Sequence, residues 1–172
     1  MAEPEVPADN QDLLDSSLWR PLWQMLGAMD HDISALYDKA GMTGMRPRFV
    51  GPLIQLARHG PMTIRELASR VEVTHSAMSQ TAAAMHRAGL VNDAENPDRR
   101  TRRIRLSARA RESLPLLEAE WRATEATVRD LEAEIPYSLS RVVEDIRAAL
   151  ARRPFRERLQ DNLGRALDPD LG

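Results

Sequence analysis

The sequence predicts a mainly α-helical protein with a small β-hairpin, an α+β fold built around a helix-turn-helix. Apolar residues recur at steps of three and four along most of the 172-residue chain, which is typical of amphipathic helices. Near its middle, a capping-box motif opens a short helix, and a second helical stretch follows after a tight turn. Two short strand candidates then flank an arginine-rich turn, which is the pattern of a wing.

The first helix is expected from Leu18 onward. Residues 1–11 are acidic and rich in proline, so we expect them to be disordered. Asp15, Ser16 or Ser17 is the expected cap of the helix, and Pro21 is tolerable only in its first turn. Gly41 and Gly44 are expected to end it. Its predicted apolar face consists of Leu18, Leu22, Met25, Met29, Ile33 and Leu36.

Two further helices are expected before the turn of the helix-turn-helix. One runs from Pro47 to Arg58, and Pro52 inside it counts against a regular helix. In the other, about residues 64–70, Thr63 and Glu66 match a capping box, because the hydroxyl and the carboxylate can each bind the other residue's backbone amide.

The second helix of the predicted helix-turn-helix begins at about His75. Met78, Ala82 and Met85 have the spacing of its buried face, and Gly89 is its expected stop. Its first turns carry small or hydrogen-bonding side chains, where a recognition helix presents groups to the edges of DNA bases. These residues are Thr74, His75, Ser76, Ser79 and Gln80.

The two strand candidates, Leu90–Asp93 and Arg102–Leu106, enclose the most basic part of the chain. The formal net charge is −2, yet Pro97 to Arg111 contains seven arginines and one aspartate. A run of charge is often only a solvated surface. Following a helix-turn-helix, this one indicates a surface that binds the phosphates of DNA.

Three helices are expected after the wing. Ser107 is the expected cap of a long helix whose apolar seam, from Leu114 to Ile135, indicates a partner helix, while Pro115 is expected to kink it or delay its regular part. Pro136 ends that helix. The next carries Leu139, Val142, Val143, Ile146 and Leu150, and a last one is expected over Phe155–Leu167 after Pro154.

Several classes of function are disfavoured. The chain has no cysteine, which excludes disulfides and thiolate metal sites. Its four histidines show no pattern of metal ligands, so no metal or cofactor is expected. We find no phosphate loop, nucleophile elbow or HExxH motif, so the protein is not expected to be an enzyme. It lacks an apolar run long enough to cross a membrane and a signal-peptide pattern, which favours a cytoplasmic location.

With these motifs the sequence resembles the MarR family of bacterial transcription regulators. The most specific match is Asp98-Arg99-Arg100-Thr101-Arg102-Arg103-Ile104-Arg105-Leu106-Ser107, which fits the family's wing pattern. Gly89-Leu90-Val91 and residues 63–67 support it, and the resemblance extends roughly from Leu18 to Leu150. It implies a homodimer of winged helices joined through the first and the last long helices.

The resemblance also implies roles for residues around the wing. The face from Thr74 to Gln80 would lie in the major groove, and Arg99 would reach the minor groove. Asp98 would hold the shape of the wing by pairing with Arg100, unless Arg100 contacts phosphate. Arg102 belongs to the same DNA-binding set. Gln80, where many relatives carry a basic residue, favours adenine readout.

The resulting division has five parts: a tail over 1–11, a dimerisation helix over 12–46, a winged helix-turn-helix over 47–106, long dimerisation helices over 107–152, and a C-terminal extension over 153–172.

Expected dimer contacts are Leu18, Leu131, Ile135, Leu139, Val143 and Ile146. An effector pocket is expected at Trp19, Trp23, Met29 and Tyr37, because ligands in the family bind between the dimerisation and DNA-binding parts.

The function expected from these observations is a dimeric, sequence-specific repressor. It would bind double-stranded DNA at a pseudo-palindromic operator and be released by a small aromatic or anionic effector. Two alternatives stay open: a DNA-binding regulator without a ligand, and a winged-helix module that binds proteins and no DNA.

Overall fold

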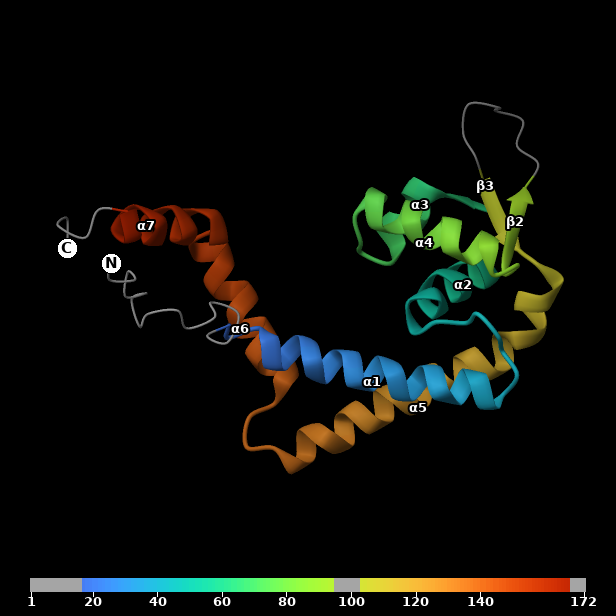
Figure 1. The fold of residues 1–172 in the computed structure, drawn as a ribbon, viewed down its shortest axis with the longest axis horizontal. Coiled ribbons are helices and arrows are strands. Elements are labelled where there is room, and N and C mark those ends of the chain that lie inside the picture. Colours follow the sequence, from blue (N-terminus) through green and yellow to red (C-terminus); the bar gives the residue numbers. More distant parts are fainter. Residues whose placement is uncertain (1–16, 95–102, 168–172) are drawn as a thin grey trace, which may run out of the picture. The chain divides into compact units, whose positions relative to one another are not determined.

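The computed structural model describes residues 17–94 and 103–167 (Figure 1). Helices and a small sheet alternate along the chain. The elements are α1 (Arg20–Lys39), α2 (Pro47–His59), β1 (Met62–Thr63), α3 (Ile64–Arg70), α4 (His75–Arg87), β2 (Val91–Ala94), β3 (Arg103–Leu106), α5 (Ala108–Glu134), α6 (Leu139–Arg152) and α7 (Phe155–Leu167). The mainly helical fold with a small β-wing is therefore confirmed.

The chain divides into two compact units, and the boundary between Ala119 and Glu120 lies inside α5. The first unit contains the helix-turn-helix, the sheet, α1, α2 and the first turns of α5. The second contains the rest of α5 with α6 and α7. The five-part division expected from the sequence is based on the role expected of each segment. The two units are instead defined by contacts within the folded chain.

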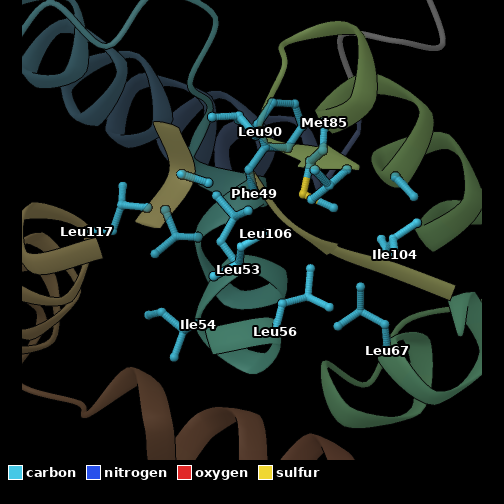
Figure 2. Packing of buried hydrophobic residues seen from close by; sticks show 14 of the residues in the cluster. Phe49, Leu53, Ile54, Leu56, Leu67, Met85, Leu90, Ile104, Leu106 and Leu117 are labelled. Atoms are coloured by element: carbon cyan, nitrogen blue, oxygen red, sulfur yellow. The ribbon is translucent and has the colours of Figure 1, made fainter. Parts of the chain in front are cut away.

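The core of the first unit is built around α2. Phe49, Leu53 and Leu56 of this helix are almost completely buried. Figure 2 shows side chains from other elements gathered around α2, namely Leu67, Met85, Leu90, Ile104, Leu106 and Leu117. Burial of such aliphatic and aromatic side chains is the main force that folds a unit of this size.

The sheet has three antiparallel strands in the order β1-β3-β2. Val91 pairs with Leu106 and Ala94 with Arg103, as in the predicted hairpin, although β2 is shifted by one residue from the expected range. The third strand, β1, pairs Met62 with Ile104 and was not predicted. Two residues are too few to show the alternation by which strands are recognised.

The N-terminal end of α1 differs from the prediction. The helix begins at Arg20, and Trp19 occupies the cap position without a side-chain hydrogen bond, so the expected cap by Ser17 is wrong; Asp15 and Ser16 lie outside the described residues. Pro21 lies in the first turn, where its missing N–H removes no helical bond. The predicted apolar face is also imperfect, because Leu36 is exposed and its neighbour Tyr37 is buried.

Most other helix limits agree with the sequence. The helix α2 runs through Pro52, whose ring is buried, and ends at Gly60 with φ of 75°. Ser107 caps α5, because its Oγ accepts a hydrogen bond from the backbone N–H of Ala110 at 3.1 Å. This helix continues through Pro115. The ranges of α3 and α7 coincide with the predicted ones.

Polar contacts shape the turns of the second unit. The carboxylate of Glu132 accepts hydrogen bonds from the backbone N–H of Ser140 at 2.7 Å and from the hydroxyl of Ser138 at 3.0 Å. The bond from the Ser140 amide is the main reason that the pKa of Glu132 is lowered. At the next turn, Arg158 donates to the backbone oxygen of Ala149, and Arg153 pairs with Asp161.

Apolar burial is lacking in this second unit. Among the described residues from Glu120 onward, none is buried. Large apolar side chains nevertheless follow one another along its helices, including Leu131, Ile135, Leu139, Val143 and Ile146. No helix in the described part of the chain is both long and apolar enough to cross a membrane.

Candidate nucleic-acid interface

One face of α4 is buried and the other is open. Met78, Ala82 and Met85 are at most 3% exposed and anchor the helix in the core. At its N-terminus, the Oγ1 of Thr74 accepts a hydrogen bond from the backbone N–H of Ala77 at 3.2 Å. All five residues predicted for base contacts are exposed on its first turns, namely Thr74, His75, Ser76, Ser79 and Gln80.

The capping box of α3 is present as predicted. Thr63 Oγ1 accepts from the backbone N–H of Glu66 at 3.1 Å, and the backbone N–H of Thr63 donates to Glu66 Oε2 at 2.7 Å. The same Thr63 belongs to β1 and pairs with Arg103 of β3. The start of α3 is thus attached directly to a strand of the wing.

A side-chain pair strengthens this attachment. The guanidinium of Arg103 donates to both carboxylate oxygens of Glu66, at 3.0 and 3.1 Å. The hydrogen bond from the Thr63 amide is the largest cause of the lowered pKa of Glu66, and Arg103 adds to it. Since both side chains are more than a third exposed, the pair contributes little to stability. Its effect is to orient the base of the wing relative to α3.

The C-terminal end of α4 is joined to the wing and to α5. Gly89 adopts φ of 67°, which lets the backbone N–H of Leu90 donate to the oxygen of Met85 at 2.9 Å. The strand β2 begins at the next residue. His86 Nε2 of α4 lies 3.5 Å from Asp93 Oδ1 of β2. The start of the wing therefore has a defined position relative to α4.

The wing residues Asp98, Arg99, Arg100 and Arg102 lie outside the described residues. The strands that lead to them are described up to the pair of Ala94 with Arg103.

Three arginines near α4 and the wing were not among the predicted site residues. Arg87 is exposed on α4, seven residues after Gln80 and so near the same side of the helix. That spacing is a signal the sequence contained. Arg103 pairs with Glu66, and Arg109 with two backbone oxygens. These partners are distant in the sequence, and no local pattern indicates them.

A hollow lies beside α1 and the segment that leads into α2. Its volume is about 430 Å³. It is lined by Gly27, Asp30, His31, Ser34, Asp38, Gly44, Met45, Arg46, Pro47 and Arg48. In the part of the chain that the structure describes, no three histidine or acidic side chains group as a metal site would require.

The hollow does not contain the four residues expected to form an effector pocket. Tyr37 is 1% exposed and belongs to the core, whereas Trp19 and Trp23 are 53% and 67% exposed. Met29 is half-buried and does not line the hollow either. Small residues such as Gly27 and Ser34 leave the space for this hollow. A prediction based on large apolar side chains does not identify such residues.

Comparisons with known proteins agree with this architecture. A model of the MarR family matches residues 51–104. No match was found among curated proteins. Among solved structures, the transcriptional regulator MosR of M. tuberculosis in complex with DNA is 23% identical, with a TM-score of 0.56 over 80% of this chain and 98% of that chain.

Two other solved structures are similar. MosR of M. tuberculosis in another crystal structure is 21% identical, with a TM-score of 0.52 over 81% of this chain and 96% of that chain. The organohalide-sensing regulator RdhR in its 2,4-dichlorophenol-bound form is 16% identical, with a TM-score of 0.55 over 88% of this chain and 90% of that chain. At these identities the comparison shows a shared fold.

The segment matched by the family model extends from α2 to β3 and contains the capping box, α4 and β2. These are the elements on which the sequence motifs and the exposed polar face of α4 depend. The resemblance to the MarR family is therefore confirmed over residues 51–104.

Proposed function

We propose that this protein is a dimeric, sequence-specific DNA-binding transcription regulator of the MarR type, acting as a repressor. The observation that carries the proposal is the exposed polar face of α4 on a helix whose opposite face is anchored in the core. Ser76, Ser79 and Gln80 offer hydrogen-bonding groups at the spacing of one helical face, which suits contacts with base edges in a major groove.

Base contacts and phosphate contacts would come from different elements. The first turns of α4 carry little charge, so Gln80 would read a base, with adenine as its best partner. Phosphate and minor-groove contacts would fall to the wing arginines Arg99, Arg100 and Arg102, with Asp98 holding the wing's shape. Each phosphate neutralised by an arginine releases counterions, so the affinity for DNA should fall steeply with salt.

A homodimer is supported by the apolar side chains that a single chain leaves in water. The six predicted dimer contacts, Leu18, Leu131, Ile135, Leu139, Val143 and Ile146, are each 40% exposed or more. Exposed apolar surface of this extent is typical of an interaction site. A two-fold dimer places two recognition helices about 10 bp apart, centre to centre, which fits a pseudo-palindromic operator.

A small anionic or aromatic effector is part of the proposal. The hollow beside α1 has the size of a small-molecule site, and Arg46, Arg48 and His31 could pair with a carboxylate or phenolate. RdhR, which shares the fold, was crystallised with 2,4-dichlorophenol. A contribution from Trp19, Trp23 and Met29 stays a prediction.

The first experiment is capture of genomic DNA by the purified chain, followed by fluorescence anisotropy on the best fragment at several salt concentrations. A palindromic motif and an affinity that falls steeply with salt are expected. Weak capture without a motif would overturn the proposal and favour a winged-helix module that binds proteins. Motif binding that no phenolic or carboxylic acid alters would favour a ligand-independent regulator.

A further inference from the structure

A guanidinium connects the end of α4 with the turn between α1 and α2. Arg109, near the start of α5, donates from Nη1 to the backbone oxygen of Ala88 at 3.0 Å. From Nη2 it donates to the backbone oxygen of Thr43 at 2.5 Å. Ala88 is the C-cap residue of α4, and Thr43 lies between α1 and α2. One side chain thus joins three elements.

The chemistry of this contact is specific to arginine. The last carbonyl groups of a helix have no partner within the helix, and a cation beside them is favourable. The planar, forked guanidinium can donate to two oxygens in a fixed geometry, whereas a lysine ammonium is a point charge on a flexible stem. The contact therefore fixes the orientation of the turn relative to the end of α4. It also places a positive charge beside the C-terminus of that helix.

The turn also passes close to the end of α4. A Cβ atom added to Gly44, the residue after Thr43, would come within 3.5 Å of the Cβ of Ala88. Gly44 and the next residue, Met45, belong to the lining of the hollow. The same short segment therefore borders the hollow and lies beside the end of α4.

The base from which Arg109 reaches is itself held in place. The backbone N–H of Ser107 donates to the oxygen of Leu90 at 3.0 Å, and Ser107 Oγ caps α5 through Ala110. Leu90 follows the end of α4 and is bonded to Met85. Because the start of α5 is fixed to this segment, the guanidinium spans a defined distance to the turn.

We infer that Arg109 is a positioning residue that transmits displacement of the 43–47 segment to the C-terminal end of α4. A ligand that shifts this segment would thereby reorient the helix. A regulatory role for this link rests on the proposed function, since it requires that α4 bind DNA. The mechanical link between the two segments does not depend on DNA binding.

The link is tested by hydrogen–deuterium exchange on the full chain without DNA. Arg109→Ala should raise exchange about tenfold in both segments, residues 40–46 and 84–90. Arg109→Lys, which keeps the charge, should raise it in the same two segments to a smaller extent. Arg111→Ala removes an exposed arginine from the same helix and serves as the control, with little change expected. An increase in one segment alone would overturn the inference.

A double-mutant cycle tests transmission itself. Gly41→Ala strains the turn, because Gly41 has φ of 70°, yet its added Cβ would meet no atom within 4 Å. In the parent it should raise exchange in residues 84–90, and in the Arg109→Ala background it should add nothing there. Equal effects of Gly41→Ala in both backgrounds would overturn transmission through Arg109.

Anisotropy on the captured DNA fragment then separates the two proposals. Arg109→Ala should weaken DNA binding about threefold to tenfold, and Arg111→Ala by less. Equal losses for the two variants would show that charge alone matters and would overturn the positioning role. If the parent chain binds no DNA while the exchange results hold, the proposed function fails and the mechanical link stands.

Discussion

The two units of this chain bury their apolar residues differently. The first unit has a continuous core that draws on all its helices and strands, from Tyr37 to Leu117. In the second, no described residue is buried, although its helices carry apolar side chains at regular spacing. The first unit can therefore be stabilised by its own interior. The second unit carries the apolar side chains of a structure that packs against another protein surface.

The difference in burial between the two units is tested most strongly at a core residue of α2. Leu53 is completely buried, so Leu53→Ala should lower the free energy of unfolding by about 2–5 kcal/mol through lost burial and a cavity. Urea denaturation followed by circular dichroism measures this loss. The matched control, Leu163→Ala on α7, removes a side chain that is 54% exposed and should have a far smaller effect. Similar losses would contradict the difference between the units.

The second unit is tested by a charge at one of the proposed dimer contacts. Val143→Asp should weaken dimerisation by about 100-fold or more, because an unpaired carboxylate would be buried. Sedimentation equilibrium should show the variant as monomer at concentrations where the parent is dimer. Arg141→Asp introduces the same residue on the opposite side of α6 and should leave the dimer intact. A parent that sediments as a monomer would refute the homodimer.

The proposed contacts with DNA bases would come from the first unit. Gln80→Ala should cost roughly 1–3 kcal/mol on the cognate site and relax base preference at one position, because a direct base contact is lost. Arg99→Ala should weaken binding to all sequences and lower the salt slope by about one. Competition anisotropy with substituted operators distinguishes the two effects. If both variants bound like the parent, the site assignment would be wrong.

The smallest expected effect is at the base of the wing. Glu66→Gln should reduce the free energy of unfolding by about 0.5–1 kcal/mol at pH 7, since it weakens the capping box and an exposed ion pair. The pKa of Glu66 is lowered from 4.5, so its stabilisation is present above that pH and is lost as the pH falls further. Urea midpoints measured from pH 7 to pH 3 should therefore converge with those of the parent. Glu112→Gln, at an exposed site on α5, is the control.

Local motifs predicted most of the helix-turn-helix. The capping box at Thr63 and Glu66 and the turn at Gly89 each depend on a few neighbouring residues, and each is present. The exposed face of α4 followed from helical periodicity. The start of α1 was predicted less well, because Trp19 occupies the cap position and makes no side-chain hydrogen bond there.

Contacts between segments that are distant in the sequence could not be predicted from local motifs. Neither the pairing of β1 with β3 nor the contact of Arg103 with Glu66 produces a local pattern. The hollow beside α1 is bordered mainly by small and polar residues, whereas the prediction favoured large apolar ones such as Trp23. Tyr37, which was expected to line an effector pocket, is buried in the core.

The sequence alone determined the helix-turn-helix, the wing strands and the family resemblance, because caps, periodicity and a basic turn are encoded by residues close together in the chain. The folded structure was needed to show which polar groups meet, among them Arg109 with Ala88 and Thr43. It also separated apolar residues that form a core from those left in water. Both depend on how distant elements pack, and packing involves residues that a local pattern does not connect.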